Sequence, residues 1–91
     1  MHAVVGTVTI NDFERGLPVL REHILPRVKQ APGLVNAYWL RSQDNRGMSA
    51  IVFESEEAAQ ALARMIESEG GPPTDAVTLN SLEVREVVAH T

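Results

Sequence analysis

Two adjacent aromatic residues, Tyr38 and Trp39, are the side chains in this sequence best suited to hold a flat organic molecule. They stand in an apolar run that predicts a strand, in which successive side chains point to opposite faces of a sheet. Asn36 shares one face with Tyr38, and Arg41 shares the other with Trp39. We therefore expect one aromatic to face any cavity and the other to face a partner surface, although both also fit the ordinary packing of core and interface aromatics.

The histidines do not form a metal-binding motif. His2, His23 and His90 are scattered along the chain, and none has a partner at the i, i+4 spacing of a helical metal pair. The chain has no cysteine, so it offers neither a thiolate nucleophile nor a sulfur ligand. We expect no metal site. His23 lies at the flank of a helical stripe and is either a boundary residue or the base of a cavity.

Three other groups of residues could take part in catalysis, but each is better explained by a structural role. Residues 47–51 begin like a nucleophile elbow, but Ile51 replaces the second glycine and the segment predicts a strand, which argues against a serine hydrolase. Glu83 and Arg85 share one face of the last expected strand and predict a surface or interface ion pair. Gly6 stands in the middle of a strand, where it leaves room for a close neighbour, and we expect a packed helix there.

Composition narrows the functional classes. The 91 residues carry a formal charge of −4, and 44% of them are hydrophobic. These values predict one folded domain over residues 1–91 and argue against nucleic-acid binding, which needs a basic face. No apolar run reaches the roughly 20 residues of a membrane helix, so we expect no membrane association. The N-terminus has no signal-peptide pattern, and we expect a cytoplasmic protein.

The order of predicted elements defines the fold class. The sequence predicts strands over residues 4–10, 34–40, 48–53 and 82–89, and helices over residues 13–28 and 56–69. Pro26 lies on the exposed side of the first helix, where we expect a bend rather than a break. This order is the α+β, ferredoxin-like βαββαβ arrangement, with an antiparallel sheet of strand order 4-1-3-2 and both helices on one face.

The strands do not alternate cleanly between apolar and polar residues. In the third strand, Met48, Ala50 and Val52 occupy one face while Ile51 and Phe53 occupy the other. Whichever face the helices cover, the opposite face therefore stays apolar, and a large exposed apolar patch invites association. We predict an obligate homodimer in which the two sheets pack face to face around a two-fold axis.

Several segments give the sequence a family resemblance. They are Glu22-His23-Ile24-Leu25-Pro26, Ala31-Pro32-Gly33-Leu34-Val35, Tyr38-Trp39-Leu40-Arg41 and Glu83-Val84-Arg85-Glu86-Val87-Val88. Together with the element order, they resemble the dimeric α+β barrel superfamily, and within it small proteins related to the antibiotic-biosynthesis-monooxygenase domain. The resemblance implies a homodimer with a small cavity between sheet and helices. Members of the superfamily include cofactor-independent quinone-forming oxygenases, haem-degrading enzymes, muconolactone isomerases and proteins without a known activity.

The resemblance also frames the candidate site. Haem-degrading members bind iron through a His on the second helix, and residues 55–69 contain none, so we expect no haem and no other cofactor. The oxygenases hold an aromatic substrate with Asn, Trp, Tyr and Arg side chains. The candidate ligand-binding residues are Asn11, His23, Asn36, Tyr38 and Trp39. Three functions stay open: a monooxygenase acting on a small aromatic or quinol-like compound, a non-catalytic ligand-binding or structural dimer, and an isomerase.

Overall fold

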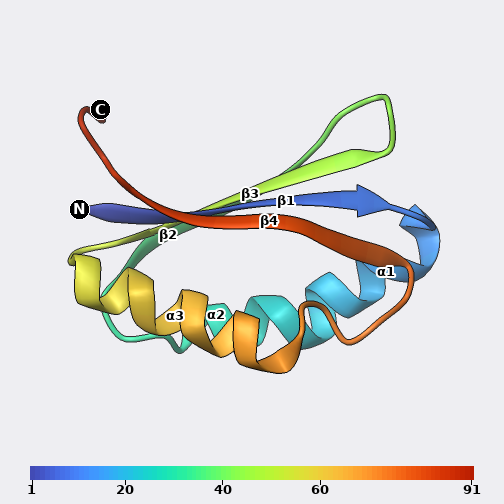
Figure 1. Cartoon of the computed structure of the whole chain (residues 1–91), viewed down its shortest axis with the longest axis horizontal. Helices are drawn as coiled ribbons and strands as arrows, with labels where there is room; N and C mark the ends of the chain where they lie inside the picture. Colours follow the sequence, from blue (N-terminus) through green and yellow to red (C-terminus); the bar gives the residue numbers. More distant parts are fainter.

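The strands form one antiparallel sheet whose order is β2-β3-β1-β4 (Figure 1). Their bounds are His2–Ile10 for β1, Leu34–Arg41 for β2, Arg46–Phe53 for β3 and Val77–Glu86 for β4. The computed structural model describes all 91 residues. The order is the predicted 4-1-3-2 counted from the other edge, and the helices all lie against one face of the sheet, so the ferredoxin-like prediction is confirmed.

After β1, three helical segments follow one another directly, with no residue between them. They are α1 (Phe13–Val19), the π-helical segment η1 (Leu20–Ile24) and α2 (Leu25–Lys29). The Asp12 carboxylate caps the start by accepting from the Arg15 N–H at 3.2 Å. In η1 the N–H of Leu25 donates to the carbonyl of Leu20, five residues earlier. This wide turn directly precedes Pro26, which has no N–H to donate, so the expected irregularity takes the form of a π-helical turn.

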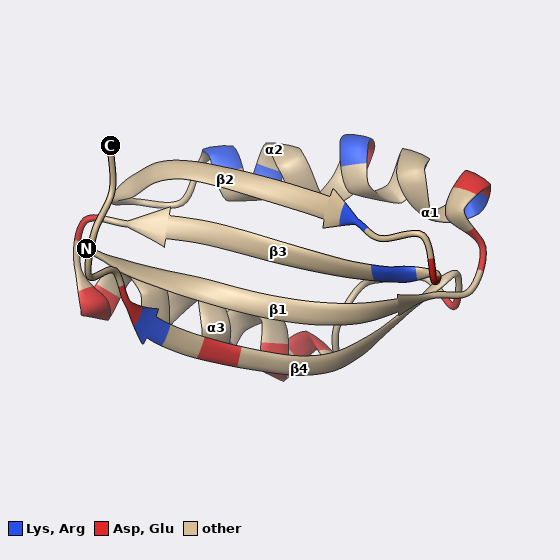
Figure 2. Ribbon diagram, turned by 90° about the horizontal axis from the view of Figure 1, so that it is seen from above, with Lys and Arg blue, Asp and Glu red and all other residues tan.

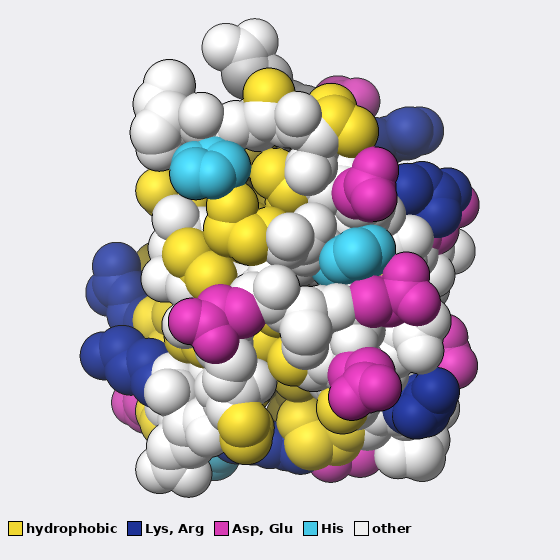
Figure 3. Space-filling model, turned by 90° about the vertical axis from the view of Figure 1, so that its left-hand side faces the viewer, with side chains coloured by type: hydrophobic (Ala, Val, Ile, Leu, Met, Phe, Trp, Pro, Cys, Tyr) yellow, Lys and Arg dark blue, Asp and Glu magenta, His cyan; other side chains and the backbone are white.

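The core lies between the sheet and α3 (Glu56–Glu69). Phe53 and Val4 are fully buried there, and they pack with Ile51, Ala59 and Leu62. The Ser55 hydroxyl caps α3 by accepting from the Ala58 N–H at 3.2 Å, and Gly70 ends the helix with a φ of 76°. Phe53 and the start of α3 lie at the end of the fold that holds the termini (Figure 1), and the surface of this end mixes apolar, acidic and histidine side chains (Figure 3).

The last strand is shifted from its predicted position. It spans Val77–Glu86, whereas the sequence predicted residues 82–89. The register between β1 and β4 changes between Thr7 and Val8: Thr7 pairs with Ser81 and Val8 with Leu79, so Asn80 is an extra residue in β4. The apolar alternation is therefore interrupted inside β4, which explains why the sequence predicted only the part that begins at residue 82. None of the helices is long and apolar enough to span a bilayer.

Candidate functional site

A cavity of about 340 Å³ lies between the sheet and the helices. Every layer of the fold contributes to its wall, and most of the lining side chains are apolar. Representative residues are Trp39 from β2, Ser49 from β3, Leu82 from β4, Leu20 and Ile24 from η1 and Met65 from α3. The π-helical turn therefore forms part of the wall, and such turns occur frequently at functional sites.

Small residues in the middle of the sheet create this space. Two rows of paired residues cross the cavity floor: Trp39-Ser49-Gly6-Leu82 and Arg41-Gly47-Val8-Leu79. Each row has a glycine at its centre, Gly6 in the first and Gly47 in the second, whereas the row through Ile51 and Val4 is filled by buried side chains. No helix approaches Gly6: a Cβ there would meet Ser49 Oγ at 2.9 Å and Leu82 Cδ1 at 3.5 Å. The expected helix contact at Gly6 was therefore wrong, and the glycine instead keeps the floor low.

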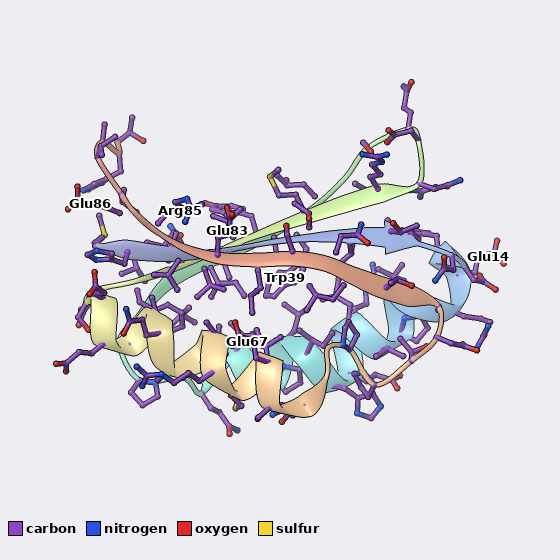
Figure 4. The ribbon with its side chains drawn as sticks, viewed as in Figure 1. Glu14, Trp39, Glu67, Glu83, Arg85 and Glu86 are labelled. Atoms are coloured by element: carbon purple, nitrogen blue, oxygen red, sulfur yellow. The ribbon has the colours of Figure 1, made fainter.

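Trp39 is the aromatic that faces the helices. Its side chain is half-buried, lies on the helix side of the sheet and lines the cavity (Figure 4). Tyr38 points to the opposite face and is 56% exposed. Asn36 is also exposed, and it pairs with Val52 while Tyr38 pairs with Ala50 on the same outer face. The strand thus divides the predicted residues between two surfaces.

Asn11 and His23 lie outside the cavity wall. The Asn11 side-chain amide donates to the Asp75 carbonyl at 3.0 Å and to Thr78 Oγ1 at 2.9 Å, which ties the end of β1 to the start of β4. His23 is exposed on η1. Of the five predicted ligand-binding residues, Trp39 is therefore the one that lines the cavity, and the structure does not bring the other four to it.

An ion pair between α2 and the end of α3 also belongs to the cavity wall. Arg27 Nη1 donates to Glu69 Oε2 at 2.8 Å, and Arg27 Nη2 donates to the other carboxylate oxygen. The hydrogen bond from Arg27 lowers the pKa of Glu69, and the same contact raises the pKa of Arg27. The two residues are 42 positions apart, so periodicity gave no sign that they would meet.

The wall does not fit histidine-ligated haem. Proteins hold haem iron with His, Cys, Met or Tyr side chains. No His, Cys or Tyr lines the cavity, and α3 carries no His. Two methionines, Met48 and Met65, are among the lining residues, but the Met48 side chain belongs to the outer face of the sheet and Met65 is 37% exposed. The chain also has no cluster of three or more His, Asp or Glu side chains suited to a metal ion.

Comparisons with known proteins agree on the fold. No family model and no curated protein matches the sequence. Among solved structures, the heme-degrader MhuD of Mycobacterium tuberculosis with two hemes in its active site is 23% identical, with a TM-score of 0.69 over 100% of this chain and 99% of that chain. A dimeric ferredoxin-like protein from an uncultured marine organism is 16% identical, with a TM-score of 0.63 over 100% and 98% of the two chains.

A third solved structure adds an oxygenase with a bound ligand. A monooxygenase from the gene ActVA-Orf6 of Streptomyces coelicolor, in complex with nanaomycin D, is 14% identical, with a TM-score of 0.56 over 99% of this chain and 92% of that chain. These neighbours are the kinds of protein that the sequence resemblance named, and they share its architecture. The chain therefore has the ferredoxin-like fold of monooxygenase-like and haem-degrading proteins.

Proposed function

We propose that this protein binds a small, flat, apolar molecule in the cavity beside Trp39. The observation that carries the proposal is an apolar space of about 340 Å³ between two layers of the fold, with an indole in its wall. Ligand sites in proteins typically have volumes of about 300–1,000 Å³ and few polar groups. Burial of apolar surface contributes about 25 cal/mol per Å², so an apolar molecule gains from such walls, and a flat ring can in addition stack on the Trp39 indole.

A fluorescence titration tests the binding. The chain contains one Trp, so its indole emission reports on the cavity directly. A panel of quinols and flat aromatic acids is titrated into the wild type and into Ser49→Leu, whose larger side chain occupies the floor beside Trp39. We expect saturable emission changes in the wild type. These changes should be lost in Ser49→Leu, because the leucine side chain fills the space that the ligand would occupy.

A matched variant separates cavity filling from general damage. Ser81→Leu makes the same chemical change at an exposed position of β4, where the Ser81 hydroxyl contacts Thr7 Oγ1 at 2.5 Å. It leaves the cavity wall unchanged, so binding should persist. Circular dichroism confirms that both variants are folded. Equal affinities of Ser49→Leu and the wild type would show that the ligand binds elsewhere and would overturn the proposal.

Oxidation of the bound molecule by O₂ is a second candidate function. It is favoured by the apolar wall next to an indole, together with the fold shared with a ligand-bound monooxygenase. In this reaction an electron-rich aromatic substrate supplies the electrons: a ring CH₂ and O₂ give a ring C=O and water. Oxygen uptake with quinol-like and anthrone-like probes tests it. Saturable binding without oxygen uptake by any probe would identify a ligand-binding module instead.

The proposal includes a homodimer formed through the outer face of the sheet. Exposed apolar side chains gather on this face of β2 and β3, namely Tyr38, Leu40 and Met48. Figure 2 shows this face: β2 and β3 carry charged residues only near their shared hairpin, whereas β4 carries Glu83 and Arg85. A second copy of the chain would cover the apolar part, as expected for an isologous interface. Sedimentation at micromolar concentration tests it, and a stable monomer contradicts it.

A further inference from the structure

Two arginines line the cavity, and only one of them, Arg27, forms an ion pair. Arg27 is bound to both carboxylate oxygens of Glu69, so its charge is balanced within the chain. Arg41 belongs to none of the ion pairs of the chain, which use Arg15, Arg27, Arg46 and Arg85. The cavity therefore has one neutralised guanidinium and one that is unpaired.

Arg41 is held in place by an aromatic ring instead of a carboxylate. Its guanidinium carbon lies 3.8 Å from the centroid of the Phe13 ring, over the ring face. Such a contact stabilises the position of the cation but uses none of its N–H donors as hydrogen bonds to oxygen. A guanidinium in this arrangement keeps the fork of donors that binds a carboxylate through two parallel hydrogen bonds.

The acidic residues nearest to Arg41 and Phe13 in the sequence form no ion pair with Arg41. Asp12, which precedes Phe13, accepts from the Arg15 N–H at 3.2 Å and caps α1. Asp44, in the turn after β2, accepts from the Ser42 hydroxyl and lies 3.7 Å from Arg46 Nε. Glu14 follows Phe13 but lies at the outer end of the molecule, away from the space between sheet and helices (Figure 4). Arg41 therefore contributes an unpaired positive charge to the hairpin end of the cavity.

We infer that the cavity is specific for a flat aromatic molecule that carries a carboxylate, with its rings against Trp39 and its carboxylate on Arg41. Trp39 and Arg41 are two residues apart on one strand, so their side chains start from the same face roughly 7 Å from each other. Gly47 is the strand partner of Arg41 and adds no side chain beside it. The inference rests on the proposed binding function and specifies its ligand class.

Calorimetric titration with a matched pair of probes tests the assignment. The probes are 2-naphthoate and its methyl ester, which share the ring system and differ in the negative charge. The wild type should bind the carboxylate at least tenfold more tightly than the ester, and this preference should shrink at high salt because a partly exposed charge pair is screened. Equal affinities for the two probes would overturn the inference.

Variants of Arg41 show whether the guanidinium causes the preference. In Arg41→Gln the carboxylate should bind roughly tenfold more weakly while the ester is unaffected, and Arg41→Lys should retain part of the preference because it keeps the charge without the fork. Arg46→Gln is the matched control, since Arg46 is an exposed arginine of the adjacent strand outside the cavity wall. It should leave both affinities unchanged.

The outcomes distinguish this inference from the proposed function. If neither probe, nor any other flat aromatic, binds the wild type, the proposed function itself fails. If both probes bind and Arg41→Gln weakens both by the same factor, Arg41 acts through its packing on Phe13, and the carboxylate assignment is wrong. If both bind and Arg41→Gln changes neither affinity, the binding function stands and the assignment of the carboxylate to Arg41 is wrong. A selective loss of the carboxylate supports the inference.

Discussion

The inner and outer faces of the β2–β3 hairpin carry the same types of side chain in different surroundings. On the inner face, Ile51 and Phe53 are 3% and 0% exposed, because α3 and its neighbours cover them. On the outer face, Tyr38 and Leu40 are each 56% exposed, and nothing in the chain covers them. The apolar surface of the inner face thus stabilises a single chain, whereas that of the outer face can stabilise only an assembly.

The inner face is itself divided. Toward the termini, the row through Ile51 and Val4 is filled, and toward the hairpin the rows through Ser49 and Gly47 are not. Close-packed interiors rarely leave such space, because each void forfeits contacts between its lining atoms. The unfilled space at the hairpin end therefore lowers the stability of the fold. Space of this kind is typical of a ligand-binding site and not of a packed core.

The largest difference between the two faces should appear in stability. Phe53→Ala should lower the free energy of unfolding by about 3–5 kcal/mol, because a fully buried ring is removed and leaves a cavity. Tyr38→Ala, at equal and low protein concentration, should change it by less than about 1 kcal/mol. Urea denaturation followed by circular dichroism measures both.

A milder core variant keeps this comparison usable if Phe53→Ala does not fold. Phe53→Leu keeps most of the volume and should cost about 1–2 kcal/mol. Similar losses for Tyr38→Ala and Phe53→Leu at low concentration would mean that the outer face also stabilises the isolated chain, and the distinction between the faces would be wrong.

An intermediate effect is expected on assembly. Leu40→Ala removes apolar surface from both copies of the proposed interface, at about 1 kcal/mol per copy for a side chain that is half-exposed beforehand. The total of about 2 kcal/mol corresponds to a roughly 30-fold weaker dimer. Analytical ultracentrifugation over a concentration series measures it. Val88→Ala is the control, since Val88 is 88% exposed beyond the end of β4, and an equal loss there would argue against the proposed interface.

Local periodicity was sufficient to predict most of the fold. The stripe from Phe13 to Val28 and the capping Ser55 defined the helices, and the short β-branched runs defined three of the strands. The start of β4 was not predictable, because the irregularity opposite Thr7 and Val8 interrupts its alternation. A break in register depends on the neighbouring strand, which a single segment does not record.

The site was less predictable than the fold. A period of two shows that Tyr38 and Trp39 face opposite ways, but it does not decide which of them faces the helices. The low floor depends on Gly6 lying beside Ser49, and this pairing follows from the register of two strands 43 residues apart. The Arg27–Glu69 pair and the stacking of Arg41 on Phe13 likewise arise from tertiary contacts. Each of these features joins residues that are remote in sequence.

The smallest predicted effect concerns the acid sensitivity of the cavity wall. The hydrogen bond from Arg27 lowers the pKa of Glu69 below the usual value of about 4.3, so the ion pair stabilises the folded chain above that pH and is lost as the pH falls through the lowered pKa. Glu69→Gln removes this contribution. Its melting temperature should therefore fall slightly less than that of the wild type between pH 7 and about pH 3.

Thermal unfolding of a second variant isolates this contribution from the loss of one negative charge. Glu67→Gln changes an exposed carboxylate on the same turn of α3 that belongs to no ion pair, so its pH dependence should follow the wild type. The pair is exposed to solvent, and solvent-exposed ion pairs contribute little. A Glu69→Gln profile that coincides with the Glu67→Gln profile would show that the Arg27–Glu69 pair adds no measurable stability to the fold and would contradict this prediction.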